Sequence, residues 1–268
     1  MDYPPPRHML RDLRLEIARA GERVEVSGPG PGETRSRGGG VSAGVLGVAV
    51  DVLGGNLALR TVQPDWCVTS TLSLHLLRPV EGGFRVTGAP LRAGRTQIVL
   101  DVKVWGEGES SKPAAVAAMA FTRIARREDT LEWVDTGDAR TVFAGPDSGL
   151  AKPFAEQLGC RVVDAAAGVV ELPVTDYVKN SVGALQGGAV IALVDAAAEA
   201  VAGARMSDPV VTRDVAVHYL ALGRAGPIRT RTHWLSGDER RARLRVELVD
   251  AGQDDRLLSV ADVGLGPL

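Results

Sequence analysis

The chain has 268 residues, of which 45% are hydrophobic and 24% are charged, a composition that is ordinary for a globular protein and gives no sign of disorder. This length allows one large domain or two of ordinary size. A net charge of −2 gives no overall attraction for nucleic acid or for an anionic membrane, so we expect neither as a partner.

The cysteines and the N-terminal residues bear on the cellular location of the protein. Only two cysteines occur, Cys67 and Cys160, and neither belongs to a CxxC pair or a histidine-cysteine cluster. Reduced structural thiols are the default for such residues, which favours the cytoplasm. The N-terminal MDYPPPRHML lacks a basic and then apolar leader, and no segment reaches the roughly 20 apolar residues that a membrane span needs. We therefore expect a soluble, unprocessed cytoplasmic protein.

The first half of the chain is predicted to be a helix followed by antiparallel strands. Residues Arg7–Ala20 carry apolar residues at helical spacing, which predicts a short amphipathic helix, and a glycine-rich loop follows at Gly28–Gly40. The segment Gly38–Ala58 is apolar apart from Asp51 and is expected to form a buried helix. Alternating polarity then predicts four strands, at Thr69–Leu77, Phe84–Leu91, Gln97–Trp105 and Ala114–Ile124.

A charged, turn-rich segment, Arg126–Ser148, leads to a second half of the same kind. A short helix is expected at Phe154–Leu158, and the stretch Asn180–Ala204 is apolar on nearly all sides, which predicts a helix enclosed by other elements. The basic run Arg240–Arg245 alternates with apolar residues and is interpreted as the solvent face of a strand, with a clamp for the phosphates of a ligand as the alternative. The predicted strands are Thr212–Leu220, Ile228–Trp234, Arg241–Val249 and Arg256–Leu265.

The start of the second long helix is unusual. It begins at Gly187-Gly188, with no Ser, Thr or Asp cap in the two preceding residues. Its first N–H groups are therefore available to an oxygen of a ligand, assisted by the helix macrodipole, which makes this a candidate oxyanion site. Two acids interrupt the same helix, Asp195 and Glu199, and Glu199 lies one turn further on the same face, consistent with either a structural or a pocket-lining role.

The two halves are copies of one pattern. Asp51 corresponds to Asp195 at an offset of 144 residues, and Thr69–Leu77 corresponds to Thr212–Leu220 at an offset of 143, with threonine over threonine and histidine over histidine. We expect each of the two histidines, His75 and His218, to have a packing or an interstrand role. A repeat of this size is a duplicated domain, and two copies of one fold usually pair about a pseudo-twofold axis.

This repeat predicts the domain organisation. We expect an N-terminal domain at residues 1–125, a linker at 126–148 and a C-terminal domain at 149–268. The two domains are expected to form an intramolecular dimer.

The second half resembles a known family. Asn180, then Gln186-Gly187-Gly188, then Leu193-x-Asp195 resemble the N-x5-HGG-x4-L-x-[DE] signature of PaaI-like hotdog acyl-CoA thioesterases, and Leu74–Pro79, LHLLRP, is similar to the strand end that follows the helix in that family. The resemblance spans nearly the whole chain. It implies an α+β double hotdog, in which two antiparallel sheets each wrap around a central helix and pair as a pseudo-dimer. It also implies an acyl-CoA substrate and a homo-oligomer. Metal, flavin, nicotinamide and P-loop motifs are absent, so no cofactor is expected.

The chain departs from the family signature in both halves. The family histidine is Gln186 in the second half. In the first half, Ser36, Ser42 and Ala43 stand where the asparagine, the histidine and a glycine would be. The first half has therefore lost its amide and its paired glycines, while it keeps its acid.

Helix geometry decides how these pieces combine. Gly187 and Asp195 are roughly 12 Å apart along one helix at about 1.5 Å per residue, whereas a general base works within about 3 Å or through one water. If the two central helices run antiparallel, Gly187 instead meets Asp51, and Ala43 meets Asp195. In the family too, as the resemblance implies, the acid comes from across the interface.

This pairing predicts two unequal sites. Site one combines residues of both halves, namely Asp51, Thr69, Asn180, Gln186 and the Gly187 N–H. Site two has Asp195 and Thr212 facing Ser36, Ser42 and the Ala43 N–H, and we expect it to be weak or silent.

The expected chemistry at site one is thioester hydrolysis. The Gly187 N–H polarises the thioester carbonyl, with Asn180 as a second donor or water holder. Asp51 activates water as a general base or attacks directly as a nucleophile, and the residues leave both open. Thr69 orients the water, and Gln186 can hold substrate but cannot shuttle a proton.

Three alternatives compete with this interpretation. Gly40–Gly44, GVSAG, fits the serine-hydrolase pattern G-x-S-x-G, but the residues before it, TRSRGG, do not form the buried strand that a nucleophile elbow requires. A hotdog hydratase carries an Asp and a His five positions on, whereas Asp214 and His218 are four apart. A tandem hotdog that binds acyl-CoA without turnover is the third alternative, favoured by the missing histidine.

Overall fold

The computed structural model describes residues 3–109, 111–126, 137–207 and 209–268. The first half contains α1 (Met9–Asp12), β1 (Glu16–Ala20), β2 (Arg23–Gly28), α2 (Ala43–Val62), β3 (Trp66–Leu76), β4 (Phe84–Ala93), β5 (Gln97–Gly106), β6 (Ala115–Ile124) and β7 (Ala139–Val142). The second half contains α3 (Phe154–Leu158), β8 (Arg161–Asp164), β9 (Val169–Leu172), α4 (Gly187–Arg205), β10 (Val211–Tyr219), β11 (Ile228–Gly237), β12 (Ala242–Asp250), the 3-10 turn η1 (Ala251–Gln253) and β13 (Arg256–Gly266). The two long helices and the eight strands predicted from alternation are all confirmed.

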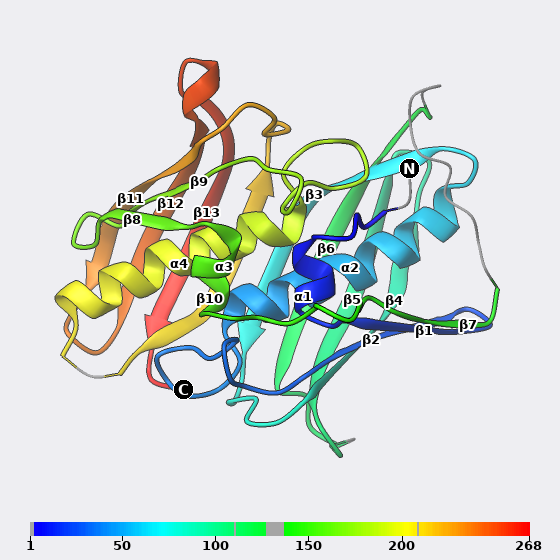
Figure 1. Ribbon diagram of the computed structural model, residues 1–268, viewed down its shortest axis with the longest axis horizontal. Coiled ribbons are helices and arrows are strands. Elements are labelled where there is room, and N and C mark those ends of the chain that lie inside the picture. The colour runs from blue at the N-terminus through cyan, green and yellow to red at the C-terminus, as the bar shows by residue number, and fades with distance from the viewer. Residues whose placement is uncertain (1–2, 110, 127–136, 208) are drawn as a thin grey trace.

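The described strands form one antiparallel sheet, and α2 and α4 lie across one face of it (Figure 1). The strand order is β7-β1-β2-β4-β5-β6-β3-β10-β13-β12-β11-β9-β8. The run β2-β4-β5-β6-β3 has the same order as β9-β11-β12-β13-β10, so each half of the repeat builds the same unit. This is the double hotdog that the resemblance implied, with the two expected sheets joined edge to edge through β3 and β10.

The joint between β3 and β10 locates the pseudo-twofold axis. Ser73 pairs with Ala216, and these two positions are equivalent at the repeat offset of 143. Two equivalent residues can face each other only where the axis passes between them. The expectation of an intramolecular pseudo-dimer is therefore confirmed by the strand register.

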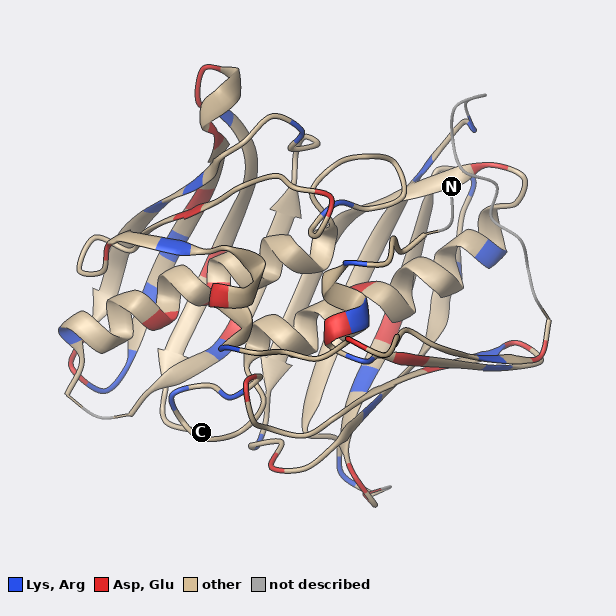
Figure 2. Ribbon diagram, viewed as in Figure 1, with Lys and Arg blue, Asp and Glu red and all other residues tan. Residues whose placement is uncertain are grey.

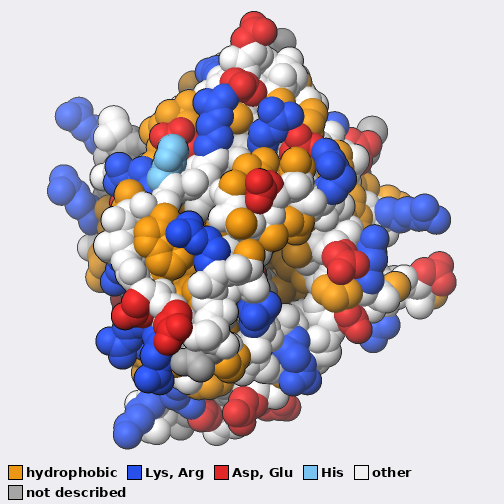
Figure 3. All heavy atoms as spheres, turned by 90° about the vertical axis from the view of Figure 1, so that its left-hand side faces the viewer, with side chains coloured by type: hydrophobic (Ala, Val, Ile, Leu, Met, Phe, Trp, Pro, Cys, Tyr) orange, Lys and Arg blue, Asp and Glu red, His pale blue; other side chains and the backbone are white. Residues whose placement is uncertain are grey.

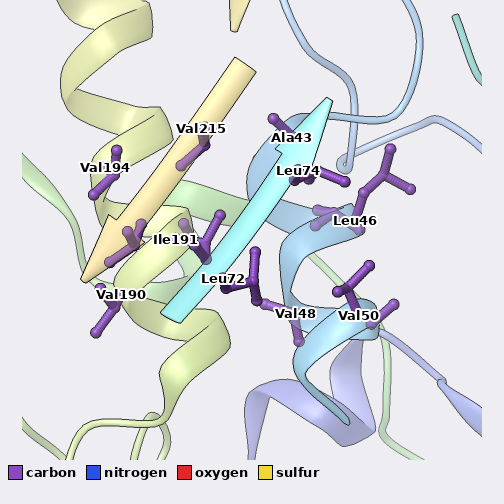
Figure 4. Close-up of a cluster of buried hydrophobic side chains, with 14 of the residues drawn as sticks. Ala43, Leu46, Val48, Val50, Leu72, Leu74, Val190, Ile191, Val194 and Val215 are labelled. Atoms are coloured by element: carbon purple, nitrogen blue, oxygen red, sulfur yellow. The ribbon is translucent and has the colours of Figure 1, made fainter. Parts of the chain in front are cut away.

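The core lies between the sheet and the two central helices. Figure 4 shows Leu46 and Val48 of α2 and Ile191 of α4 gathered above Leu72 and Leu74 of β3. All five side chains are fully buried, and truncating one such residue to alanine typically costs about 2–5 kcal/mol. The helices themselves carry few charges (Figure 2).

Glycine lets the two helices approach closely. A Cβ at Gly188 would lie 2.6 Å from Val48 Cα, and a Cβ at Gly47 would lie 2.4 Å from Ile191 Cγ2. Side chains at these points would force the helices apart. The start of each helix is thus held against the partner helix, which positions the acids described below.

The hydropathy of these helices corrects one expectation. By length and composition alone, α2 and α4 are each apolar enough to cross a membrane, so the prediction that no segment qualifies is wrong. Most of each helix is buried within the protein. A core helix enclosed by other elements shows the same apolar composition.

The N-terminal segment also differs from the prediction. The helix expected at Arg7–Ala20 is limited to α1, and β1 replaces its second part. The buried residues Leu13, Leu15 and Ile17 alternate with more exposed ones, and this period of two prevails because β1 pairs with β2. The helix prediction was wrong because Leu10, Leu13 and Ile17 fit a helical period, whereas Leu13, Leu15 and Ile17 fit a period of two.

Segments outside the two hotdog units complete the sheet and tie the halves together. Strand β7 lies inside the segment 126–148 that was predicted to be a linker, and it pairs with β1, while residues 127–136 lie outside the described residues. Tyr177 donates its hydroxyl to Asp12 Oδ2 at 2.8 Å, so the N-terminal segment is bound to the second half. The predicted domain boundaries remain a prediction.

The outer surface carries no dominant charge on the side of the second half. The face in Figure 3 mixes basic, acidic and hydrophobic side chains. On β12, Arg243 and Arg245 point outward between buried neighbours, and Arg245 Nε donates to Asp262 Oδ1 at 2.9 Å. The basic run is thus the solvent face of a strand, as predicted.

Candidate active site

The two central helices are antiparallel, and each acid binds the start of the other helix. The Gly188 N–H donates to Asp51 Oδ2 at 3.0 Å, and the Gly44 N–H donates to Asp195 Oδ2 at 2.8 Å. Hydrogen bonds to a charged group stabilise a fold by about 1.5–3 kcal/mol each, and the positive end of each helix adds to this. The antiparallel arrangement inferred from the repeat is confirmed.

At site one, the Asp51 carboxylate lies directly against Gly187. A Cβ at Gly187 would lie 2.6 Å from Asp51 Oδ1, so no other residue fits this position without displacing the acid. The neighbouring Gly188 N–H is the group that binds Asp51, which leaves the Gly187 N–H for a ligand. Within the described residues, the Gly187 N–H donates no hydrogen bond. This is expected at the first position of a helix whose cap residue, Gln186, makes no side-chain capping bond.

Thr69 and burial set the protonation of Asp51. The Thr69 hydroxyl donates to Asp51 Oδ1 at 2.9 Å, and Asp51 is only 8% exposed. Burial raises the pKa of Asp51 to about 6, while the bonds from Thr69 and Gly188 act in the opposite direction. The carboxylate is therefore mostly ionised at neutral pH yet basic enough to accept a proton.

The remaining predicted residues of site one are Asn180 and Gln186. Asn180 Oδ1 accepts the N–H groups of Val182 and Ala184 at 3.1 and 3.0 Å, which fixes the side chain and leaves its amide nitrogen as the donor end. Gln186 is 6% exposed, and its Oε1 has no hydrogen-bond partner among the described residues. A buried polar atom of this kind needs a partner, which a bound substrate or water can supply.

A cavity of about 570 Å³ connects these groups. Its lining includes all five predicted residues of site one, Asp51, Thr69, Asn180, Gln186 and Gly187. Further walls come from the N-terminal segment, β1, α2, β3, β6 and the loop after β10, including Tyr3, Ile17, Trp66, Phe121, Leu220 and Leu222. The last two leucines are 58% and 39% exposed, so the cavity opens to solvent beside the second half.

Site two has the same acid without the cavity. None of Asp195, Thr212, Ser36, Ser42 and Ala43 lines the cavity of site one. Ser42 caps α2 by accepting the Val45 N–H at 3.2 Å, and Thr212 is 1% exposed. Asp195 Oδ1 and Thr212 Oγ1 make no hydrogen bond of ordinary geometry among the described residues, in contrast to the bonded pair Asp51 and Thr69. Burial raises the pKa of Asp195, while the nearby Thr212 and Ser42 hydroxyls and the Gly44 N–H act in the opposite direction.

Sequence reasoning missed one residue of site one. The Tyr219 hydroxyl donates to the Gly187 carbonyl oxygen at 3.0 Å and lines the cavity, so it holds the first residue of α4 in place. Its repeat counterpart is Leu76. This polar-for-apolar difference between the two copies was the available signal.

The other predicted groups lie outside the cavity. Ser42 follows a loop with one isolated bridge, Arg35 to Val41, and its hydroxyl caps a helix, so the serine-hydrolase alternative is contradicted. His75 Nδ1 lies 2.8 Å from Asp214 Oδ1 on the neighbouring strand, which confirms an interstrand role. Arg241 and Arg243 line a separate hollow of about 270 Å³, and no arginine of the run 240–245 lines the cavity of site one, so the CoA phosphate-clamp alternative finds no support at site one.

Known structures share this fold over nearly the whole chain. A hotdog protein of unknown function from Alicyclobacillus acidocaldarius is 15% identical, with a TM-score of 0.63 and 97% of both chains covered. A Thermobifida fusca protein provisionally named a thioesterase II is 18% identical, with a TM-score of 0.58 and 98% of both chains covered. An acyl-ACP thioesterase from Bacteroides thetaiotaomicron is 14% identical, with a TM-score of 0.59 and 91% of this chain and 98% of that chain covered. The protein has the hotdog fold, in its double form.

Sequence comparisons point to thioester hydrolysis in general. Residues 38–112, which contain Asp51 and Thr69, match the thioesterase superfamily. A Saccharolobus solfataricus protein provisionally named an esterase is 34% identical over 95 residues, which cover 35% of this chain and 65% of that protein. The alignment therefore spans just under two thirds of that relative. The superfamily match lies in the first half, whereas the signature identified above lies in the second.

Proposed function

We propose that the protein is a PaaI-like, tandem-hotdog acyl-CoA thioesterase that hydrolyses its substrate to a free acid and CoA at site one. The observation that carries this proposal is the arrangement of the Asp51 carboxylate beside the Gly187 N–H in the wall of one cavity. The superfamily match supports the reaction class. A cytoplasmic location accords with two free cysteines, Cys67 and Cys160.

In the proposed reaction, the thioester carbonyl oxygen accepts the Gly187 N–H at the positive end of α4. Asp51 takes a proton from a water molecule as the water oxygen attacks the carbonyl carbon. The negative charge that develops on the carbonyl oxygen is stabilised by the N–H and the helix macrodipole. The carbon–sulfur bond then breaks, and the Asp51 carboxylic acid returns the proton to the CoA thiolate.

The other residues orient this reaction. Thr69 donates to Asp51 Oδ1 and so fixes the carboxylate plane. The Asn180 amide nitrogen is a second donor for the substrate or the attacking water, because its oxygen is held by the backbone. Gln186 lacks the proton-transfer capacity of a histidine and instead binds the substrate.

The decisive experiment compares the two repeat acids. Wild type, Asp51→Asn and Asp195→Asn are assayed for thiol release from acetyl-, butyryl-, octanoyl-, dodecanoyl-, palmitoyl- and benzoyl-CoA. Each asparagine keeps an oxygen to accept the N–H of the partner helix, so both variants are expected to fold. Asp51→Asn should lose about 10²–10⁴-fold in kcat/KM, the range of general acid–base catalysis. Asp195→Asn should keep the wild-type rate.

Two outcomes would contradict this assignment. Equal losses in the two variants, or a loss with Asp195→Asn alone, would show that site one is not the reaction site. Tight binding of an acyl-CoA by the wild type with no release of thiol would instead identify a non-catalytic acyl-CoA-binding protein. Testing each acyl group on acyl carrier protein as well would identify the carrier.

A further inference from the structure

From Asp51, the cavity runs along one face of α2. The lining residues on this helix are Asp51, Val52, Gly55, Asn56 and Leu59, which recur at the helical spacing of three to four. Asp51 and Leu59 are separated by ~12 Å of helix, which is room for roughly eight to ten carbon atoms of an extended chain. The opposite walls are mostly apolar, from Ile17, Trp66, Val68, Phe121 and Phe143, and also include Thr141 and Arg19. Arg19 donates to Asn56 of α2.

Gly55 lies in the middle of this face and leaves it open. It follows Asp51 by one helical turn, and a Cβ at this position would meet no atom within 4 Å. The preceding Gly54 has a packing reason, because its Cβ would lie 2.5 Å from Met119 Sδ. Glycine is a poor helix former, and at position 55 no close contact requires it. What its missing side chain provides is space in the cavity.

The repeat shows what happens when this space is filled. Gly55 corresponds to Glu199 at the offset of 144 that relates Asp51 to Asp195. Glu199 lies on α4 one turn beyond Asp195, and its Oε2 accepts the Arg37 N–H at 3.4 Å. Gly55 lines the cavity and Glu199 does not. Site two therefore has a side chain where site one has room for a ligand.

We propose that Gly55 determines the length of the acyl group that site one accepts. This acyl group is a medium-length, largely apolar chain that lies along α2. At site two, Glu199 closes the equivalent space. The chain then holds one acyl group rather than two. The acyl substrate in this inference rests on the proposed function, whereas the structural observation behind it is the depth of the part of the cavity that lies along α2.

The test is a graded series at position 55 with a matched control on the other helix. Gly55→Ala and Gly55→Val are compared with Glu199→Val, which places the same valine at the equivalent position outside the cavity. Activity is measured against linear acyl-CoAs from acetyl to palmitoyl. In the wild type the preferred chain is expected near octanoyl or decanoyl. Each added side-chain carbon should shorten it, with about a fourfold loss in kcat/KM per methylene that no longer fits.

The short substrates and the fold serve as internal controls. Hydrolysis of acetyl-CoA should persist in both Gly55 variants, because Asp51 and Gly187 are unchanged. Gly55→Ala should raise Tm, since alanine favours a helix more than glycine does, so at least one variant in the series is expected to fold. Glu199→Val should keep the wild-type chain-length profile. An unchanged profile in Gly55→Val, or the same shift in Glu199→Val, would overturn the inference.

A binding assay separates this inference from the proposed function. The probe is 11-(dansylamino)undecanoic acid, displaced by unlabelled linear fatty acids of increasing length. If the wild type releases no thiol but Gly55→Val shortens the best competitor, the proposed function fails and the role of Gly55 stands. If the wild type hydrolyses acyl-CoA while Gly55→Val alters neither the hydrolysis profile nor the displacement profile, the reverse holds. Absence of both hydrolysis and displacement in the wild type would refute both.

Discussion

The two ends of the helix pair carry the same reciprocal bond in different surroundings. Asp51 and Asp195 each accept an N–H at the start of the partner helix, and they are 8% and 5% exposed. Burial raises the pKa of both. The bond to the partner helix, the exposure and the direction of the pKa shift therefore do not distinguish them. The difference is that a cavity reaches Asp51 and bypasses Asp195.

This comparison separates a structural role of the repeat acid from a catalytic role. Capping the partner helix explains why both copies of the repeat keep an acid, so the acid alone does not identify a reaction site. Around Asp195, small or blocking groups replace the groups that serve a substrate at site one. Ala43 stands for Gly187, Ser42 for Gln186 and Glu199 for Gly55. The reaction site is thus defined by the residues that admit a substrate.

Exchanging glycine and alanine at the helix starts should give the largest effect among the further tests. Gly187→Ala places a methyl group where 2.6 Å separates a Cβ from Asp51 Oδ1, so the acid and the N–H donor must move apart. Misplacing an oxyanion donor typically costs about 10²–10³ in kcat. Ala43→Gly is the matched control and should leave hydrolysis unchanged. Steady-state kinetics with a Tm measurement test this, and comparable losses at both positions would remove the distinction between the sites.

Removing the two repeat threonines should give a smaller, pH-dependent difference. Activity of the wild type requires ionised Asp51, so kcat/KM should rise through about pH 6, the pKa of Asp51, and then level off. In Thr69→Val the hydrogen bond that lowers this pKa is lost, and the rise should move up by about one pH unit. The pH profile of kcat/KM measures this shift.

The threonine of site two provides the control for that profile. Thr212 lies beside Asp195, and neither residue lines the cavity of site one, so Thr212→Val should preserve the pH profile of hydrolysis. A shifted profile in Thr212→Val, or none in Thr69→Val, would contradict the assignment of Asp51 as the base.

Glu199, the second acid near site two, should affect stability without affecting hydrolysis. Burial and then the charge of Asp195 raise the pKa of Glu199 from 4.5 to about 8. Between pH 4.5 and 8, the folded state therefore keeps a proton on Glu199 that the unfolded chain releases. The stability that Glu199 contributes below pH 4.5 is lost as the pH rises towards 8. Glu199→Gln should lose this dependence, which amounts to no more than ~1.4 kcal/mol per pH unit.

Thermal unfolding between pH 5 and 8 tests this last prediction. The wild type should lose stability over this range relative to Glu199→Gln, while their rates of thiol release stay alike. If the stabilities of the wild type and Glu199→Gln instead change in parallel with pH, Glu199 is already ionised and solvated in the folded protein. Site two would then not be the closed counterpart of site one.

Several features were predictable because they depend on local pattern and on the repeat. Period-two alternation located the eight main strands, and unbroken apolar runs located α2 and α4. The repeat offset and the helical rise of about 1.5 Å per residue together paired Gly187 with Asp51. That inference needed only two helices related by a twofold axis.

Other features depended on contacts between distant segments. Leu10, Leu13 and Ile17 fit a helical period, and Leu13, Leu15 and Ile17 fit a period of two. Pairing of β1 with β2 decided for a strand. The role of Tyr219 depends on the place of the Gly187 carbonyl, 32 positions earlier in the chain. The four-residue strand β7 shows no pattern of its own and exists because β1 offers it an edge.

The sequence by itself determined a duplicated α+β domain, two buried helices and the acids that face across them, because periodicity and repetition are written in the order of the residues. The tertiary structure alone decided which acid meets a cavity. A cavity is the volume that side chains from many segments leave unfilled, so a single position such as Gly55 acquires its meaning only when the surrounding walls are in place.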